Sequence, residues 1–376
     1  MKVFLKKLAS IDWLMLSSAL LISLAGLVTM SSFAGENPFF ARQLVWIGIS
    51  VAIFFIFSAL DFRFLRRTEI IVGLFVVSCL TLLALFIFGS VFKGAQSWFN
   101  FGIFAFQPSD PIKLVVILVL AKYFTRRHVE IAHIRHILVS ATYVFIIFIL
   151  VFLQPDFGSA IIILSLWFGM VLVSGISKKH LFMVLGIGLV SFLILWLFIF
   201  APYQKQRIMT FINPLTDIRG AGYNAYQSTI AVGSGEWVGK GIGFGTQSKL
   251  SFLPEYQTDF IFAAFAEEWG FVGVLILFSL FGLLFSRIIS ASFHGASNFE
   301  VLFGLGVLVL FLSHFIIHVG MNIGLLPVTG TTIPFMSYGG SHLLTEFAAI
   351  GILNSMSKYQ RTVHREVIAE SNVFLS

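Results

Sequence analysis

The stretch LPEYQTDFIFAAFAEEWG, residues 253–270, joins a polar segment to an apolar run that is long enough to enter a membrane. It places carboxylates on Glu255, Asp259, Glu267 and Glu268 at the head of this run. At the rise of an α-helix, Glu267 and Glu268 lie about 12–14 Å deeper than Asp259. Ionisable groups at such depth are costly and usually face a cavity or a partner. The stretch therefore predicts a membrane helix whose first turns carry functional or paired carboxylates.

The composition extends this interpretation to the whole chain. Of its 376 residues, 58% are hydrophobic and 11% are charged, and the mean hydropathy is +0.97. One globule cannot bury so much apolar surface, so we expect an all-α, polytopic membrane protein. The net charge of +7 comes from residues between the apolar runs, which indicates topology and not nucleic-acid binding. The single cysteine, Cys79, excludes a disulfide framework.

About ten apolar runs are long enough to be transmembrane helices. An even number places both termini on one side of the membrane. The short segments on that side hold most of the Lys and Arg, whereas the short loops opposite hold only Arg42 and Lys93. This bias predicts cytoplasmic termini, with the first run retained as a helix and not cleaved as a signal peptide. The ten predicted spans are residues 11–31, 43–60, 69–89, 109–124, 137–153, 157–175, 181–200, 259–286, 299–324 and 340–357.

One large loop, residues 201–258, lies on the outer side between the seventh and eighth predicted spans. It is rich in Gly, Asn, Gln and Ser, and a polar loop of this length is more often functional than not. Its GKGIGFG segment, residues 239–245, is not a P-loop because no GK[ST] ends it. The loop is either simply flexible, or its glycines let the backbone approach a polar ligand. Four of the five Lys and Arg residues in the loop suit an anion such as a phosphate: Arg207, Arg219, Lys240 and Lys249.

Asp259 is the last polar residue before FIFAAFA, residues 260–266, so we place it at the membrane–water boundary. It has a structural interpretation, because a carboxylate after Thr258 suits the start of a helix. It also has a functional interpretation, which Glu267 and Glu268 favour because they add costly charges on the same helix.

Other polar residues within the apolar runs are candidate partners. Asp110 and Lys113 are spaced i, i+3 and can pair, more plausibly for structure than for catalysis. Asp156, in QPDFG, is explained well enough by a tight turn. His314 and His318, spaced i, i+4, are only a weak sign of a metal site, because no third ligand accompanies them.

The stretch PVTGTTIPFMSYGG, residues 327–340, interrupts the helical pattern with two prolines and a final glycine pair. Irregular backbone at membrane depth is tolerated where it lines a cavity or is buried in protein. Ser337, Tyr338 and Ser341 could then present hydroxyl groups to such a cavity.

Seven segments, spread in order along essentially the whole chain, resemble the SEDS family (shape, elongation, division and sporulation), whose main members are RodA and FtsW. The pairing of LPExxTDFIF with SYGGS is highly specific for it. GTQS, residues 245–248, and DFRFLRR, residues 61–67, resemble the RodA branch. The seven segments are GAQSWFNFG (94–102), FQPSDPIKL (106–114), LQPDFGSA (153–160), NPLTDIRGAGYNAYQS (213–228), GKGIGFGTQS (239–248), FLPEYQTDFIFAAFAEEWGFVG (252–273) and GLLPVTGTTIPFMSYGGS (324–341).

The resemblance implies a single membrane domain over residues 1–376 that acts as a peptidoglycan glycosyltransferase. Such an enzyme polymerises lipid II, the undecaprenyl-pyrophosphate-linked disaccharide pentapeptide, at the outer face of the bacterial cytoplasmic membrane. It does so during cell elongation and shape maintenance. The implied partners are a class B penicillin-binding protein, which is the crosslinking transpeptidase, and other elongation proteins.

The resemblance also implies that Asp259 is the catalytic residue. A carboxylate can act as general base on the acceptor hydroxyl, and going from an α-linked donor to a β-linked product requires inversion. The resemblance implies a divalent cation, Mg or Mn, whose ligands are unknown. We expect structural or supporting roles for Asp110, Lys113, Asp156, Glu267 and Glu268. The expected substrate-binding residues are Arg42, Arg207, Lys240, Thr246, Gln247, Glu255, Thr258, Ser337 and Ser341.

The chain departs from the family pattern at several positions. Asp110 replaces a usual glutamate, so we expect its link to Lys113 to be looser or water-bridged. Ser97 replaces a usual basic residue, and His318 stands where Asn is common. Two rival functions stay open: a flippase for lipid-linked precursors, which the charged membrane segments suit equally well, and a non-catalytic scaffold of the cell-wall complex.

Overall fold

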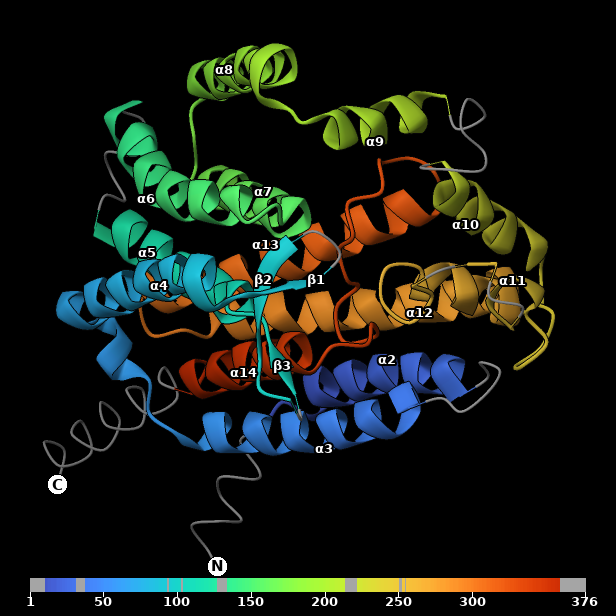
Figure 1. Ribbon diagram of the computed structural model, residues 1–376. Helices are drawn as coiled ribbons and strands as arrows, with labels where there is room; N and C mark the ends of the chain where they lie inside the picture. Colours follow the sequence, from blue (N-terminus) through green and yellow to red (C-terminus); the bar gives the residue numbers. More distant parts are fainter. Residues whose placement is uncertain are drawn as a thin grey trace, which may run out of the picture.

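The computed structural model describes residues 11–31, 38–92, 95–102, 104–126, 134–213, 222–249, 252–253 and 255–358. Long helices run side by side in these ranges, and a few strands cross one face of the bundle (Figure 1). The elements in chain order are α2 (Trp13–Ser31), α3 (Pro38–Ala59), η1 (Arg63–Arg66), α4 (Thr68–Phe88), β1 (Ser90–Phe92), β2 (Ala95–Asn100), β3 (Ala105–Phe106), α5 (Ser109–Arg126), α6 (Ile134–Leu153), α7 (Phe157–Val173), α8 (Lys178–Ile194), η2 (Leu195–Ile199), α9 (Pro202–Ile212), α10 (Tyr223–Ser234), α11 (Thr246–Lys249), α12 (Ile261–Phe293), α13 (Asn298–Asn322) and α14 (Gly340–Met356).

All ten predicted spans coincide with helices, namely α2 to α8 and α12 to α14. Seven of the described helices are long and apolar enough to cross a membrane. The other three are α7 and α14, which have 17 residues each, and α5, which carries Asp110 and Lys113 in its first turns. The membrane class of the fold is therefore confirmed, whereas the number of ten crossings stays a prediction.

The two described ends of the chain meet at one end of the bundle. The backbone N–H of Asp12, just before α2, donates to Asn354 Oδ1 in α14 at 3.0 Å. The Asp12 carboxylate also pairs with Arg287 near the end of α12, at 2.7 Å. This arrangement fits an even number of crossings. Which side of the membrane this end faces stays a prediction.

Helices α12 and α13 occupy the middle of the bundle, with α2, α3 and α14 on one side and α5 and α7 on the other (Figure 1). Aromatic side chains fill much of the space between them. The rings of Phe281 in α12 and Phe315 in α13, for example, lie 4.7 Å apart. Buried aromatic and aliphatic side chains run along the whole length of both helices, and this packing fixes their relative position.

Helix α12 is kinked at Gly270, whose φ of 64° and ψ of −168° are not helical. A left-handed φ is cheap for glycine alone, because glycine has no Cβ. At the kink the outer loop pairs with the helix backbone: Lys240 N–H donates to Glu267 O at 3.0 Å, and Phe271 N–H donates to Glu236 O at 2.9 Å. The loop therefore reaches about 14 Å along α12 from its start.

The region from residue 90 to residue 106 differs from the all-α expectation. It forms a small antiparallel sheet in the order β1-β2-β3, with Ser90 opposite Trp98 and Phe99 opposite Phe106. The loop of residues 201–258 also contains regular structure in α9, α10 and α11. Lys93 and Arg219 lie outside the described residues, as do the side chains of Arg207 and Lys249.

Candidate active site

Asp259 lies in the turn that leads into α12, and its side chain is partly buried. Its backbone N–H donates to Glu255 O at 3.0 Å. Its backbone carbonyl accepts from Asn322 Nδ2 at 3.0 Å. A Cβ placed on Gly330 would lie 3.6 Å from Asp259 Oδ2, so the carboxylate faces the backbone of that glycine. The carboxylate thus sits between the outer loop and the irregular segment of residues 327–339, which we call the central segment.

Glu255 and its neighbours shape this turn. Glu255 has a left-handed φ of 54°, and its Oε2 accepts from the Thr258 hydroxyl at 3.3 Å. Burial, and then the negative charge of Glu255, raises the pKa of Tyr256 above its ordinary value. Tyr256 is therefore protonated near neutral pH and does not compete with Asp259 as a base.

The central segment is pinned to the Asp259 turn by Ser337 and Tyr338. Ser337 Oγ donates to Thr258 O at 2.9 Å and accepts from Ile333 N–H at 3.0 Å. Tyr338 N–H donates to Gln257 O at 2.9 Å. Ser337 is 2% exposed, and its hydroxyl already makes two hydrogen bonds within the protein. In this geometry it holds the central segment against the Asp259 turn. Its expected contact with substrate stays a prediction.

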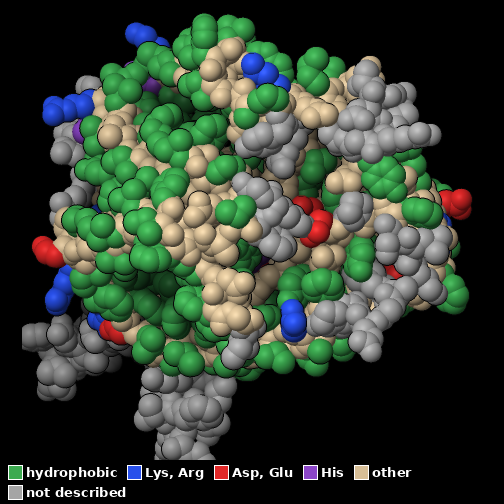
Figure 2. Space-filling view, in the orientation of Figure 1, with side chains coloured by type: hydrophobic (Ala, Val, Ile, Leu, Met, Phe, Trp, Pro, Cys, Tyr) green, Lys and Arg blue, Asp and Glu red, His purple; other side chains and the backbone are tan. Residues whose placement is uncertain are grey.

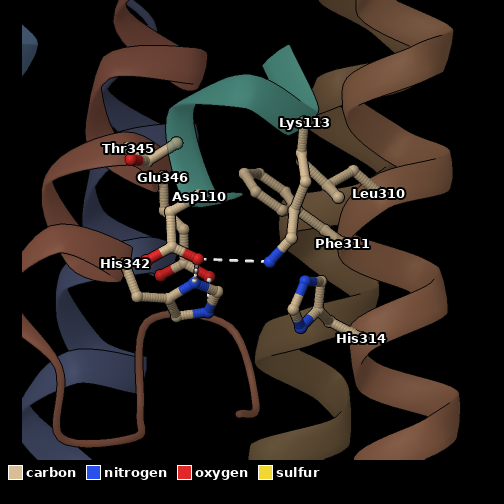
Figure 3. A pocket seen from close by; sticks show the side chains of 8 residues that line it. All are labelled: Asp110, Lys113, Leu310, Phe311, His314, His342, Thr345 and Glu346. Atoms are coloured by element: carbon tan, nitrogen blue, oxygen red, sulfur yellow. Dashed lines mark hydrogen bonds and ion pairs between the residues drawn. The ribbon is translucent and has the colours of Figure 1, made fainter. Parts of the chain in front are cut away.

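Asp110 is the centre of a buried polar cluster at the start of α5 (Figure 3). Its Oδ1 lies 3.1 Å from Lys113 Nζ, so the expected pair is present and direct, not water-bridged. Its Oδ2 accepts from the Ser341 hydroxyl at 2.9 Å. His342 Nδ1 lies 3.4 Å from Oδ1. The shorter Asp side chain is thus satisfied by groups from α14 as well as by Lys113.

His342 continues the cluster toward Glu346 and the central segment. Its Nε2 lies 2.9 Å from Glu346 Oε1 and 2.8 Å from the Thr332 hydroxyl. Glu346 Oε2 accepts from Phe335 N–H at 2.7 Å. Figure 3 shows the Lys113 ammonium pointing from the other side toward Asp110 and the His314 ring, across a cavity with room for about one water molecule.

Glu267 and Glu268 hold the Gly-rich loop. Glu267 Oε1 accepts from Lys240 Nζ at 2.7 Å and from the backbone N–H of Thr246 at 2.8 Å. Both of its oxygens accept from Gln247 N–H, at 3.1 and 3.2 Å. Glu268 Oε1 accepts from Gly243 N–H at 3.0 Å. The glycines do bring backbone N–H groups close to an anion, but this anion is a pair of carboxylates from the chain itself.

The remaining predicted residues lie around this centre. Asp156 caps α7 by accepting from Ser159 N–H at 3.0 Å, and its Oδ2 accepts from Gln107 Nε2 at 2.8 Å. Arg42 is exposed on α3, next to Gln43, whose Nε2 donates to Ser337 O at 3.2 Å. The side chain of Arg207 lies outside what the structure describes, so its expected role stays a prediction.

His314 and His318 both contact backbone carbonyl groups of the central segment, and they do not point to a common ligand position. Their Nδ1 atoms lie 3.1 Å from Thr332 O and 2.7 Å from Thr331 O, respectively. Among the described residues no three His, Cys, Asp or Glu side chains gather in a way that could hold a metal ion. Within the described part of the chain, His314 and His318 are therefore not joined by a third ligand of these types.

Asn322 is a site residue that the sequence interpretation missed. It is fully buried and bonds to the Asp259 turn, although it lies 63 positions away in the sequence. Its signal was available: an amide at i, i+4 from His318, at the end of an apolar run, is a costly residue unless it is fully hydrogen-bonded. The sequence interpretation also missed His342 and Gln43, which are likewise polar residues buried in the bundle.

Figure 2 shows a largely hydrophobic face with acidic side chains set in a hollow near its middle. The kinked α12, the broken central segment and the partly buried carboxylate of Asp259 together define a polytopic membrane protein with a polar site at the start of α12. The sequence profile of the FtsW/RodA/SpoVE family, described as cell cycle proteins, matches residues 5–362. The chain belongs to this family.

Relatives and solved structures agree with this assignment. The chain is 37% identical to the peptidoglycan glycosyltransferase MrdB of Escherichia coli strain K12, over 78% of this chain and 79% of that protein. It is 36% identical to stage V sporulation protein E of Bacillus subtilis strain 168, over 94% of this chain and 99% of that protein.

Two solved structures share the fold over 93% of this chain. One belongs to a peptidoglycan synthase complex that coordinates polymerization and crosslinking, with a TM-score of 0.81, 28% identity and 98% of that chain covered. The other is the rod shape determining protein RodA of Thermus thermophilus, with a TM-score of 0.69, 27% identity and 97% of that chain covered. The similarity to RodA supports the RodA-like branch expected from the sequence.

Proposed function

We propose that this protein is a peptidoglycan glycosyltransferase that polymerises lipid II on the outer side of the bacterial cytoplasmic membrane during cell elongation. The relationship to MrdB, which is named for this activity, supports the reaction class. The assignment of the site rests on the position of Asp259. Its partly buried carboxylate lies just before the start of α12, between the outer loop and the central segment.

In the proposed reaction, a sugar hydroxyl oxygen of the acceptor attacks the anomeric carbon of the donor. The bond from this carbon to the pyrophosphate oxygen breaks, and the pyrophosphate leaves with the bonding electron pair. Asp259 accepts the hydroxyl proton as the new glycosidic bond forms. A single displacement inverts the anomeric carbon and needs no covalent enzyme intermediate, by analogy with inverting glycosidases.

The leaving pyrophosphate requires positive charge near it. Arg42 is exposed close to the central segment, and Lys240 is 29% exposed at its side chain while paired with Glu267. Mg²⁺ is commonly bound by substrate phosphates with one or two protein carboxylates, so a Mg or Mn ion remains part of the proposal without a complete protein site. Loss of activity with a chelator, reversed by the metal, tests the requirement.

The partner we propose is a class B penicillin-binding protein, supported by the likeness to a chain of a peptidoglycan synthase complex. Its membrane helix would lie on an apolar face of α12 and α13 formed by exposed residues such as Leu275, Ile276 and Ile316. Photo-crosslinkers at these positions should capture the partner. Consistent capture from α6, on the far side, would refute this location.

The decisive experiment is polymerisation of purified lipid II by the protein in proteoliposomes, alone and with its candidate transpeptidase. Long glycan strands made from lipid II already on the outer face establish the transferase. Translocation of lipid II without polymer would establish the flippase instead. A protein that supports cell-wall assembly but does neither, with or without substitution of Asp259, would be a scaffold.

A further inference from the structure

Asn322, the last residue of α13, joins three parts of the molecule through one side chain. Its Nδ2 donates to Asp259 O at 3.0 Å and to His318 O at 2.8 Å. Its Oδ1 accepts from Ala263 N–H, in the first turn of α12, at 3.2 Å. Ser228 Oγ, in α10, donates to Asn322 O at 2.9 Å and lies 3.3 Å from the same Oδ1. Both amide donors and the amide oxygen of this side chain are therefore used.

His318 carries the connection on to the central segment. Its Nδ1 lies 2.7 Å from Thr331 O, and Thr331 follows Gly330, whose backbone faces Asp259 Oδ2. Hydrogen bonds therefore link Asp259 through Asn322 and His318 to Thr331, and the proximity of Gly330 to Asp259 Oδ2 closes a ring of contacts beside the carboxylate. One side of the ring fixes the Asp259 backbone, and the other fixes the backbone that faces its side chain.

The contact with Thr331 O also defines the tautomer of the His318 imidazole. A carbonyl oxygen can only accept, so His318 Nδ1 must carry the hydrogen. The other ring nitrogen, Nε2, is buried and has no hydrogen-bond partner among the described residues. The hydrogen bond that Nδ1 donates to Thr331 O is thus the polar contact of the His318 side chain within the described residues.

We propose that Asn322 and His318 are positioning residues that hold Asp259 at a fixed distance from residues 330–331. This inference rests on the proposed function, because it takes Asp259 to be the base. A side-chain cap does not supply this precision, since Phe260, the residue before α12, makes no cap hydrogen bond. A displacement of about 1 Å in a reacting group can lower a rate by about 10²-fold, which is the scale of effect that such a ring prevents.

The test uses the shapes of Asn and Gln. The Asn amide nitrogen overlays His Nδ1, whereas the Gln amide nitrogen overlays Nε2. His318→Asn therefore keeps a donor toward Thr331 O, His318→Gln places it elsewhere, and His318→Leu removes it. His136→Leu is the matched control, because His136 is also buried but bonds to Tyr123, in a separate contact between α5 and α6.

We expect His318→Asn to polymerise lipid II within about threefold of the parent, and His318→Gln and His318→Leu to lose about tenfold or more in kcat at nearly unchanged KM. His136→Leu should keep the parental kcat. Asn322→Asp, which turns a donor into an acceptor facing two carbonyls, should lower kcat in the same way. If His318→Leu does not fold, the comparison of Asn with Gln decides.

Equal kcat for all folded His318 variants would overturn the inference, as would equal losses for Asn and Gln. The Asp259→Asn variant separates this result from the proposed function. If Asp259→Asn is inactive while every His318 variant matches the parent, the base assignment stands and the positioning role falls. If Asp259→Asn polymerises normally, the base assignment itself falls.

Discussion

Lys240 Nζ lies 2.7 Å from Glu267 Oε1, and this ion pair fastens the outer loop to α12. The same oxygen accepts from the backbone of Thr246, so one buried carboxylate organises several loop residues. A small apolar cluster of Ala231 and Leu253 from the loop with Phe260 and Ala263 adds to this attachment. The pair therefore links the stability of the loop to the geometry of the site.

Replacing Glu267 by Gln should lower the free energy of unfolding by about 2 kcal/mol, because the charge that several donors converge on is lost. The value is modest because Lys240 is partly exposed and its attraction is screened. Glu236→Gln, the same change at an exposed position of the same loop, should stay within about 0.5 kcal/mol. Denaturant unfolding in micelles measures both, and equal effects would contradict the role assigned to Glu267.

Gly270→Ala should be destabilising by about 1–3 kcal/mol, because alanine is strained at φ 64°. An added Cβ would also meet the backbone of Val238 at 2.7 Å. Gly282→Ala on the same helix is the control, since a Cβ there has nothing within 4 Å and alanine favours helix by about 1 kcal/mol. The two variants should shift the thermal midpoint in opposite directions. A shared direction would argue against a required kink.

Lys113→Met should reduce folded yield and activity together, because it leaves Asp110 as a charge buried at 4% exposure. Breaking a buried pair typically costs about 3–5 kcal/mol, and Ser341 and His342 should place this case at the lower end. Adding Asp110→Asn to Lys113→Met should recover most of the stability. Lys179→Met, at an exposed position on α8, is the control. Full folding of Lys113→Met with only the chemical step lost would point to proton transfer instead.

Asp259→Asn should abolish glycan polymerisation while leaving a folded membrane protein. Asn preserves the shape and the helix-start preference of Asp, but it cannot take a proton at neutral pH. Loss of a general base typically lowers the rate by about 10²–10⁴-fold. Lipid II turnover in proteoliposomes, with partner and divalent cation present, measures the loss, and a thermal melt controls for folding. Turnover within a few-fold of the parent would make Glu255 the next candidate.

The helices could be predicted because the apolar runs are long and are separated by local signals, such as the turn at Asp156 before α7 and the interruption at residues 327–340 before α14. The Asp110–Lys113 pair could be predicted for the same reason, since i, i+3 residues are neighbours on any helix. The short strands between α4 and α5 could not, because each has few residues and depends on its partner strand.

The assembly of the site could not be predicted from local pattern. Asp259 meets Asn322 and Gly330, and Asp110 meets Ser341, across separations of tens to hundreds of residues. The sequence also did not predict which anion the N–H groups of the Gly-rich loop would bind, because a Glu267 carboxylate and a phosphate offer similar acceptor oxygens. Glu267 and Glu268 favoured a functional interpretation of Asp259, but its assignment as the catalytic residue came from the family resemblance, since a carboxylate at a helix start also has an adequate structural explanation.

Helix α8 stands apart from the bundle in Figure 1, and none of its residues is buried. Together with η2 it forms a 22-residue apolar rod, about 33 Å long, which nearly matches a hydrocarbon layer of about 30 Å. Packing against the protein does not set its tilt, so hydrophobic mismatch with the surrounding lipid does. The acyl-chain length of the host bilayer thereby becomes a variable of this protein's structure. In thinner membranes we expect α8 to tilt further from the bilayer normal and to shift α9, which follows it directly.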